Sequence, residues 1–284
     1  MRKYTSLIID IKGSRKYSVE DRTLLQYYLV HVIEKLNVLF EPGIVFDITF
    51  SAGDELQGLF SNTMWAVMYL RLLEIMVHPV QIRAGIGVGE WNVKIEGGIS
   101  TQQDGPTYHM ARAAIEDVYK MQTQRFKIYS DDKETDIMAS YLLNVSKSLL
   151  EAQNMVQNRI QLISEIMYPF IEKNSVLQHA GYASNLLEIK ENYNLKKSAQ
   201  KSNEISKIMF DINVEEPIYI IDEIVEAEKY TAKKNAAGKI AEILKQSRQN
   251  IDTVMRRGKI IIIRNMDYIA LQYIKRNYGG MNDL

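Results

Sequence analysis

The chain has 284 residues and no cysteine, and its 35 Lys and Arg balance its 35 Asp and Glu. Disulfides, thiolate catalysis and cysteine-based zinc sites are therefore excluded. No segment approaches the roughly eighteen uninterrupted apolar residues that a membrane-spanning helix needs. The short apolar run in MRKYTSLIID leads directly into acidic residues, which is typical of a strand and not of a signal peptide. These features predict a globular cytoplasmic protein with no membrane partner.

The zero net charge conceals an uneven distribution. The segment from Thr231 to Leu284 contains eleven Lys and Arg but four acidic residues, so it carries a formal charge of +7 and the rest of the chain −7. A basic module on an otherwise acidic protein favours a polyanionic partner, although a solvated basic helix surface has the same composition.

Short strand-like and longer helix-like patterns alternate over the first 130 residues. Apolar spacing predicts strands at 4–11, 43–51, 55–60, 80–93 and 126–130, and helices at 18–40, 63–77 and 107–122. Ser18 and Asn62 are suited to cap the first two helices. The order β-α-β-β-α-β, extended by a helix and a strand, predicts an α+β protein whose N-terminal domain follows the ferredoxin-like plan.

Strand signals become rare after about residue 133. We expect one long helical run at 135–173 that breaks near Pro169, a polar loop at 192–203 and a helix-turn-helix within about 231–260. The apolar run after Gly258 suggests a further strand and a packing helix. The predicted domains are therefore 1–132, of α+β type, and 133–284, mainly helical.

Acidic residues occupy two positions that this plan brings together. Asp10 ends the first strand, and Asp54 and Glu55 follow Gly53 at the tip of a predicted hairpin. Gly-Asp is also ordinary turn chemistry, so the hairpin alone is not specific. In the ferredoxin-like plan the first strand and the hairpin strands lie in the middle of one sheet, which makes Asp10 and Asp54 neighbours.

A Mg²⁺ or Mn²⁺ ion suits such a site, because hard cations bind carboxylate, carbonyl and phosphate oxygens. Asp10 and Asp54 would supply carboxylates, and Ile11 a backbone carbonyl. The turn amides of Lys12, Gly13 and Ser14 are suited to phosphate oxygens, with Lys12 or Arg15 as countercharge.

Four segments in the same order resemble the class III nucleotidyl cyclase domain: LIIDIKGSR, AGDELQGLF, IRAGIGVGE and DGPTYHMARAAI. The hairpin is also similar to the Gly-Gly-Asp-Glu-Phe turn of diguanylate cyclases. The N-terminal segments together with the C-terminal helices resemble the bacterial SatD family, whose members pair a cyclase-like domain with a helix-turn-helix. The cyclase resemblance covers about residues 4–130, and the SatD resemblance covers most of the chain.

The resemblance assigns roles to individual residues. Asp10 and Asp54 match the two metal-binding aspartates, and Glu55 matches the additional acid of the diguanylate type. The resemblance also implies a nucleoside triphosphate ligand and a head-to-tail homodimer with the site between subunits. The nucleotide-binding residues that we predict are Lys12, Gly13, Ser14, Arg15, Phe50, Gly53, Arg83, His109 and Arg112.

Three family positions carry other residues in this chain. The base-selecting Lys falls on Phe50, so the choice of base is not inherited. The Asn and Arg that serve the ribose and the transition state fall on His109 and Ala113. Arg112 is one position before Ala113, and one position on a helix corresponds to a rotation of about 100°. These departures favour nucleotide binding over cyclase turnover.

The remaining conspicuous residues have structural explanations beside functional ones. Arg83 either faces phosphate or is an edge charge. His109 either contacts a ligand, or caps a helix turn or fills a gap in the core. Gly85, Gly87 and Gly89 indicate close backbone approach on one strand face. His31, His78 and His179 have no partner at metal-ligand spacing, so we interpret them as structural.

The basic C-terminal segment fits a helix-turn-helix pattern. Ala241 is small where helices would cross, Leu244 and Ile251 would face the core, and Ser247 would begin the second helix. Lys245 departs from the pattern, because a Gly commonly makes this turn. The exposed side chains suited to bases and phosphates, and therefore predicted to bind DNA, are Arg248, Gln249, Asn250, Thr253, Arg256 and Arg257. Such modules also mediate protein contacts.

Three functions remain open on the sequence alone. The first is a metal-dependent nucleotide-binding domain coupled to a helix-turn-helix, with a regulatory or signalling role. The second is an active nucleotidyl cyclase, and the third is a DNA-binding regulator whose cyclase-like domain only mediates dimerisation.

Overall fold

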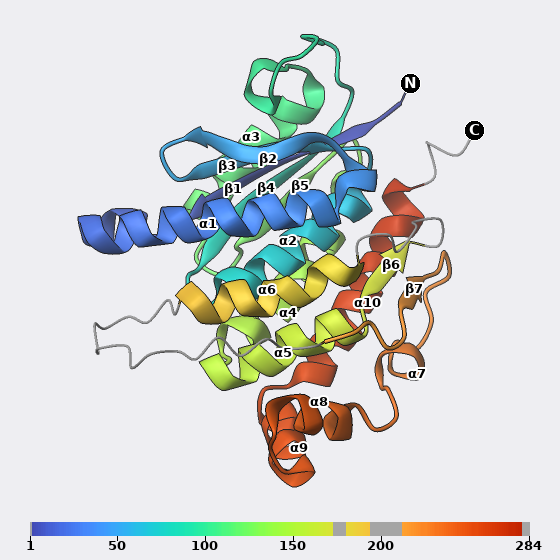
Figure 1. The fold of residues 1–284 in the computed structure, drawn as a ribbon. Coiled ribbons are helices and arrows are strands. Elements are labelled where there is room, and N and C mark those ends of the chain that lie inside the picture. The colour runs from blue at the N-terminus through green and yellow to red at the C-terminus, as the bar shows by residue number, and fades with distance from the viewer. Residues whose placement is uncertain (1, 173–179, 194–211, 280–284) are drawn as a thin grey trace.

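The computed structural model describes residues 2–172, 180–193 and 212–279, and two groups of elements organise them (Figure 1). The first group comprises β1 (Tyr4–Ile11), α1 (Val19–Leu39), β2 (Ile44–Ala52), β3 (Glu55–Phe60), α2 (Thr63–Val77), β4 (Ile82–Gly89), α3 (Pro106–Lys120) and β5 (Phe126–Tyr129). The second comprises α4 (Lys133–Glu151), α5 (Met155–Met167), β6 (Phe170–Glu172), α6 (Ala180–Tyr193), β7 (Ile218–Ile220), α7 (Glu228–Thr231), α8 (Ala236–Leu244), α9 (Arg248–Arg257) and α10 (Ile260–Tyr278). No helix in these described ranges is both long and apolar enough to cross a membrane.

The main sheet has five strands in the order β2-β3-β1-β4-β5. Its first four strands pair antiparallel, and β5 lies parallel to β4. The α+β class and the β-α-β-β-α-β order are therefore as expected from the sequence. The expectation that both hairpin strands lie in the middle of the sheet was half right: β3 is beside β1, but β2 is an edge strand.

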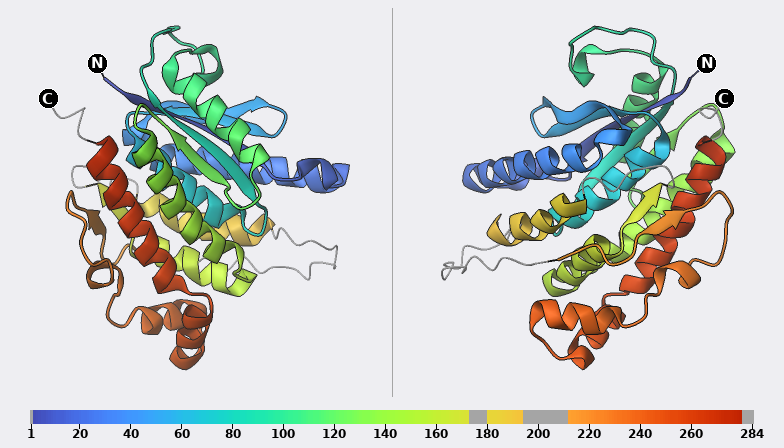
Figure 2. Two further views of the ribbon diagram at one scale, coloured as in Figure 1. Left: turned by 180° about the vertical axis from the view of Figure 1, so that it is seen from behind. Right: turned by 45° about the vertical axis from the view of Figure 1, so that its right-hand side comes forward.

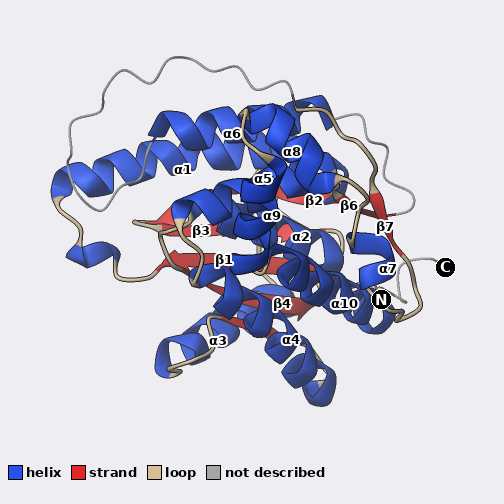
Figure 3. Ribbon diagram, turned by 90° about the horizontal axis from the view of Figure 1, so that it is seen from below, coloured by secondary structure: helices blue, strands red, loops and turns tan. Residues whose placement is uncertain are grey.

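Helix α3 covers one face of the sheet and α1 and α2 cover the other (Figures 2 and 3). Glycines on β4 permit the close approach of α3. A Cβ at Gly85 would lie 2.3 Å from the carbonyl oxygen of Ala111, and one at Gly87 would lie 2.1 Å from that of Thr107. The strand that the sequence predicted from 80 to 93 thus allows α3 to pack closely against it, and it ends at Gly89.

Helix α2 joins the two groups of elements. All of its residues except Leu72 are buried, because the sheet covers one side of it and α5 and α10 pack against the other. Its Arg71 pairs with Asp267 of α10 at 2.6 Å and with Glu165 of α5 at 3.2 Å. Glu165 also forms an ion pair with Arg264 of α10 at 2.7 Å. The hydrophobic core is continuous across the predicted domain boundary at residue 132.

Helix boundaries follow local capping chemistry. Ser18 accepts from the Asp21 amide and Asn62 from the Trp65 amide, so both predicted caps are confirmed. The run at 135–173 breaks earlier than Pro169, because Asn154 and Gln157 form a reciprocal capping box that starts α5.

Three expectations for the second half need correction or fall outside the described residues. Pro169 precedes β6, which pairs with β7 in a small parallel sheet that the sequence did not indicate. The apolar run after Lys259 is the first turn of α10 and not a strand, because Ile260 and Ile263, at helical spacing, are buried while Ile262 is exposed. Asn192 and Tyr193 end α6, and residues 194–203 of the predicted loop lie outside the described residues, as does His179.

Helices α8 and α9 are joined by Lys245, Gln246 and Ser247. Lys245 adopts the left-handed conformation, with φ 51°, at the position where the sequence pattern lacked its usual Gly. Ser247 caps α9 by accepting from the Asn250 amide, and Ile251 is fully buried. The local geometry of the predicted turn is therefore formed without glycine.

Candidate functional site

The end of β1 lies beside the tip of the β2–β3 hairpin. Ile9 of β1 pairs with Leu56 of β3. Asp10 follows Ile9 and Glu55 precedes Leu56, so the two acids are neighbours on adjacent strands. On the other side, Asp10 pairs directly with Arg83 of β4. Gly53, with φ 63°, makes the hairpin turn that leads into Asp54 and Glu55.

Asp10 lies on the face of the sheet covered by α3. Side chains alternate along a strand, and Ile8, two residues earlier, packs against Ala111 and Ile115 of α3. Burial, followed by the charge of Asp54, raises the pKa of the Asp10 carboxyl to about 6. The guanidinium Nη1 of Arg83, 3.9 Å from Asp10 Oδ2, acts in the opposite direction but does not cancel these effects.

Asp54 contributes the second incompletely paired carboxylate. Its Oδ2 is buried and has no hydrogen-bonding partner within the described part of the chain. A buried carboxylate oxygen without a donor carries a free-energy cost that a cation would remove. The structure therefore brings together Asp10 and Asp54, the pair on which the sequence-based metal site depends.

Glu55 differs from these two acids because it is fully paired. Arg112 of α3 donates to both of its carboxylate oxygens, at 2.5 Å and 2.8 Å, and the Ser51 hydroxyl donates to Oε1 at 2.8 Å. Although burial acts in the opposite direction, these donors hold the pKa of the Glu55 carboxyl below its usual value. Glu55 is thus close to Asp10 and Asp54, but its oxygens are already occupied.

Tyr119 is a member of this site that the sequence analysis missed. The Arg83 guanidinium lies 5.3 Å from the centre of its ring, and burial, with the charges of Asp10 and Glu55, raises the Tyr119 pKa to about 12. The available signal was its spacing: Tyr119 follows Arg112 by seven residues, which is two turns of the same helix face.

The residues fit a divalent cation only in part. Among the described residues no group of three or more His, Asp or Glu side chains is arranged to hold a metal. Mg²⁺, however, is commonly held by one or two carboxylates, with water and phosphate oxygens completing its six ligands. The orphaned Asp54 oxygen and the incompletely compensated Asp10 meet that requirement. Ile11 is buried and pairs with Ile82 of β4. Its backbone carbonyl stays a predicted ligand of the cation.

The residues of the turn after β1 differ in what they contact. The Lys12 amide donates to the Gln81 carbonyl at 2.9 Å, and its ammonium donates to the Gln81 side chain at 2.8 Å. The Lys12 amide is therefore occupied, whereas its ammonium has two further N–H donors, so a contact of this ammonium with phosphate stays a prediction. Arg15 is near enough to lower the pKa of Asp10. Gly13 is left-handed, with φ 74°, and leads into the short 3₁₀ helix that starts at Ser14.

Two further nucleotide-binding candidates lie away from the carboxylates. Phe50 pairs with Leu56 and packs against the core on the α1 face, opposite to Asp10. There it lines a groove of about 400 Å³ with Gly53 and four residues of α1, Thr23, Gln26, Tyr27 and Val30. His109 is exposed on α3, where its Nε2 lies 3.2 Å from Asp104 Oδ1.

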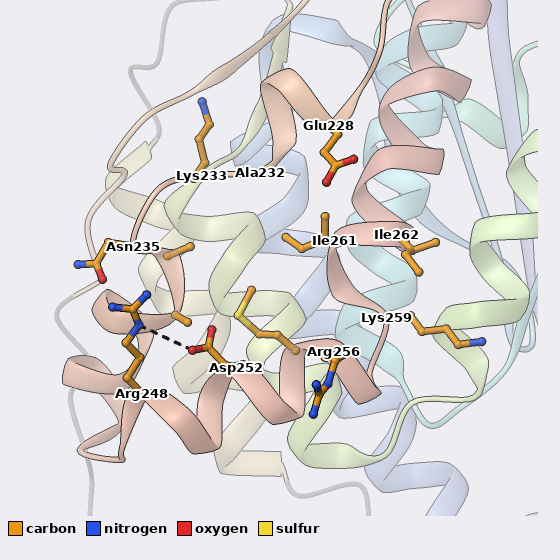
Figure 4. Close-up of a pocket in the computed structure, with 13 residues that line it drawn as sticks. Glu228, Ala232, Lys233, Asn235, Arg248, Asp252, Arg256, Lys259, Ile261 and Ile262 are labelled. Atoms are coloured by element: carbon orange, nitrogen blue, oxygen red, sulfur yellow. Dashed lines mark ion pairs between the residues drawn. The ribbon is translucent and has the colours of Figure 1, made fainter.

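The predicted DNA-binding side chains of α9 divide between two surfaces. Arg248 and Arg256 line a pocket of about 500 Å³ together with Asp252 and with Lys259 at the start of α10 (Figure 4). Arg248 Nε lies 3.7 Å from Asp252 Oδ2. Outside the pocket lining, Gln249, Asn250 and Arg257 are exposed, and Thr253 donates to the Gln249 carbonyl.

The fold and the paired acids define an α+β protein with a β-α-β-β-α-β sheet and an acidic site at one end of it. The family model of the SatD family matches residues 4–202, and the chain therefore belongs to the SatD family. No curated protein matches the chain.

Two solved structures resemble part of the chain, and both are described as a bacterial light-regulated adenylyl cyclase. The first is 15% identical, with 44% of this chain and 74% of that chain covered and a TM-score of 0.32. The second is 13% identical, with 44% and 42% covered and the same TM-score.

Proposed function

We propose that this SatD protein binds a nucleoside triphosphate together with one Mg²⁺ or Mn²⁺ ion at the junction of β1 and the β2–β3 hairpin. The observation that carries the proposal is the incomplete pairing of Asp10 and Asp54. Both carboxylates are partly buried, and the pKa of Asp10 is raised while Asp54 Oδ2 lacks a donor. A divalent cation would supply the missing positive charge, and it would neutralise phosphate charge when bound.

Nearby arginines suit the phosphates of such a ligand. Arg83 and Arg15 are both close enough to influence the charge state of Asp10. Guanidinium groups bind phosphate oxygens in two-point contacts, so these two side chains are the proposed phosphate ligands, while Arg112 stays paired with Glu55.

Binding without efficient cyclisation is the form of this function that the geometry supports best. Phe50, at the base-selecting position, lies on the opposite face of the sheet from Asp10. His109 pairs with Asp104, and Arg112 pairs with Glu55, so neither is placed free at the carboxylates. Loss of a transition-state arginine can cost three or more orders of magnitude in rate.

A thermal-shift experiment tests the proposal. Each of the four ribonucleoside triphosphates is added with Mg²⁺, and one at a hundredfold excess over its Kd would stabilise the protein by about 2.7 kcal/mol. We expect Asp10→Ala and Asp54→Ala to abolish this shift, and Asp47→Ala, at an exposed position on β2, to retain it. The absence of a shift with every triphosphate would refute the proposal. Release of pyrophosphate would instead identify an active cyclase.

A second candidate function is binding of DNA by α8 and α9 as a helix-turn-helix. The observation that favours it is the collection of cationic side chains in and beside the pocket of Figure 4. Arg248, Arg256 and Lys259 line it beside the first turn of α8, whose amides also favour anions. Gln249, Asn250 and Arg257 would contact base edges or further phosphates.

Salt dependence of DNA retention tests this second function. We expect affinity to fall linearly on a logarithmic scale with salt, and Arg256→Gln to reduce that slope by about one unit, the value for one lost phosphate contact. Glu134→Gln, at an exposed position of α4, is the control, with no change of slope. Retention that does not respond to salt would refute DNA binding. Substitution is preferable to deleting the tail, because α10 belongs to the core.

The resemblance to cyclases also implies a head-to-tail homodimer, which we retain as a proposal. Light scattering with and without Mg²⁺ and nucleotide tests it. A mass near 32.8 kDa under all conditions would show a monomer and would contradict it.

A further inference from the structure

The three acids beside β1 are not equivalent. Both oxygens of Glu55 accept from Arg112, and Oε1 also accepts from Ser51. Within the described residues, the ion pair of Asp10 is with Arg83 Nη1 at 3.9 Å, which is beyond hydrogen-bonding distance. Asp54 has one oxygen with no partner in the described part of the chain. One carboxylate of the three is thus saturated and two are available.

The Arg112–Glu55 contact has the geometry of a strong pair. It is a two-point guanidinium–carboxylate contact, and the Glu55 side chain is only 14% exposed. Charge-assisted two-point contacts of this kind are about twice as strong as neutral hydrogen bonds. Moving Glu55 to a cation would require both of these bonds and the Ser51 bond to break.

We propose that Arg112 is a positioning residue that holds Glu55 out of the ligand set of the cation site. The inference rests on the proposed function, because it concerns the same cation. In the free protein the cation contacts the carboxylates of Asp10 and Asp54, and water completes its coordination. Affinity for the free ion is consequently limited, since affinity for hard cations rises with the number of charged ligands.

Substitution of Glu55 and of Arg112 should have different effects on Mn²⁺ affinity, measured by electron paramagnetic resonance without nucleotide. Glu55→Gln should leave the Kd within twofold of the wild-type value, while Asp54→Asn should weaken binding by tenfold or more. Arg112→Met should tighten binding by at least fivefold, because it frees a third carboxylate. The double variant Arg112→Met/Glu55→Gln should return to the wild-type value.

Loss of a positive charge alone would also tighten binding in Arg112→Met, so a second readout is needed. Electron–nuclear double resonance of bound Mn²⁺ in deuterated water counts the coordinated water molecules. We expect Arg112→Met to have fewer of these than the wild type, because Glu55 replaces water. An unchanged water count would overturn the proposal, and so would a tenfold loss of affinity in Glu55→Gln. No Mn²⁺ binding by the wild type would instead refute the proposed function itself.

Discussion

The buried ion network between α2, α5 and α10 makes a strong prediction about stability. The Glu165 side chain is 6% exposed and accepts hydrogen bonds from Arg71 at 3.2 Å and from Gln161 at 2.8 Å. It also forms an ion pair with Arg264 at 2.7 Å. Glu165→Gln retains the size of the side chain but removes its charge. Arg71 keeps Asp267 as an ionic partner, whereas Arg264 keeps the carbonyl of Tyr168 and the ring of Phe170 but has no other carboxylate partner among the described residues.

The expected cost follows from that difference. Removal of one member of a buried ion pair typically destabilises a protein by about 3–5 kcal/mol, because the remaining charge is left uncompensated. We place Glu165→Gln at about 3 kcal/mol, since its amide oxygen can still accept one bond. Most domains are stable by only about 5–15 kcal/mol, so the midpoint of urea unfolding should fall markedly.

Urea unfolding followed by circular dichroism measures this cost. Glu134→Gln, in the exposed first turn of α4, is the matched control and should lie within about 0.5 kcal/mol of the wild type. The network joins both halves, so a single transition should be observed for secondary structure and for Trp65 and Trp91 fluorescence. A loss below about 1 kcal/mol for Glu165→Gln, or a separate early transition of the second half, would refute the reasoning.

Three further predictions concern His78, Gly85 and Lys245. Burial and nearby Lys190 lower the pKa of His78 to about 4. The unfolded chain therefore binds more protons than the folded chain between about pH 4 and 6.5. Through His78, the free energy of unfolding should fall by up to about 3 kcal/mol as the pH falls through that window. His78→Gln should remove this part of the slope in urea titrations at several pH values, and an unchanged slope would contradict it. Gly85→Ala should cost about 3 kcal/mol by overpacking against the α3 backbone, and a melting temperature equal to the wild type would exclude the observed approach of α3 to β4. Lys245→Gly should stabilise the protein by about 1 kcal/mol, because Lys is strained at φ 51°; destabilisation in urea would show that another conformation is adopted.

The first half of the fold was accessible from the sequence because its signals are local. Ser18 and Asn62 mark helix starts, and the short apolar run within residues 4–11 marks a buried strand. The juxtaposition of Asp10 with the hairpin followed from the order of the elements. The other side chains of the site could not be predicted from that order. The position of Tyr119 and the pairing of Arg112 with Glu55 depend on how α3 crosses the sheet.

The second half was less accessible because tertiary contacts override its local patterns. The apolar run at 260–263 has high strand propensity, yet it is helical since α10 is surrounded by α2, α4 and α9. Strands β6 and β7 have three residues each, too few for any periodicity. The break at Asn154 was visible in principle, because Asn-x-x-Gln is a capping pattern.

The most direct test of the cation site is a crystal of the protein grown with Mn²⁺ and a nonhydrolysable triphosphate. An anomalous difference map locates Mn²⁺ without reference to the protein atoms. We predict one peak at about 2.1 Å from a carboxylate oxygen of Asp10 and of Asp54, with Glu55 still paired with Arg112. A map with no peak at these two carboxylates, while the triphosphate is bound elsewhere, would contradict the account.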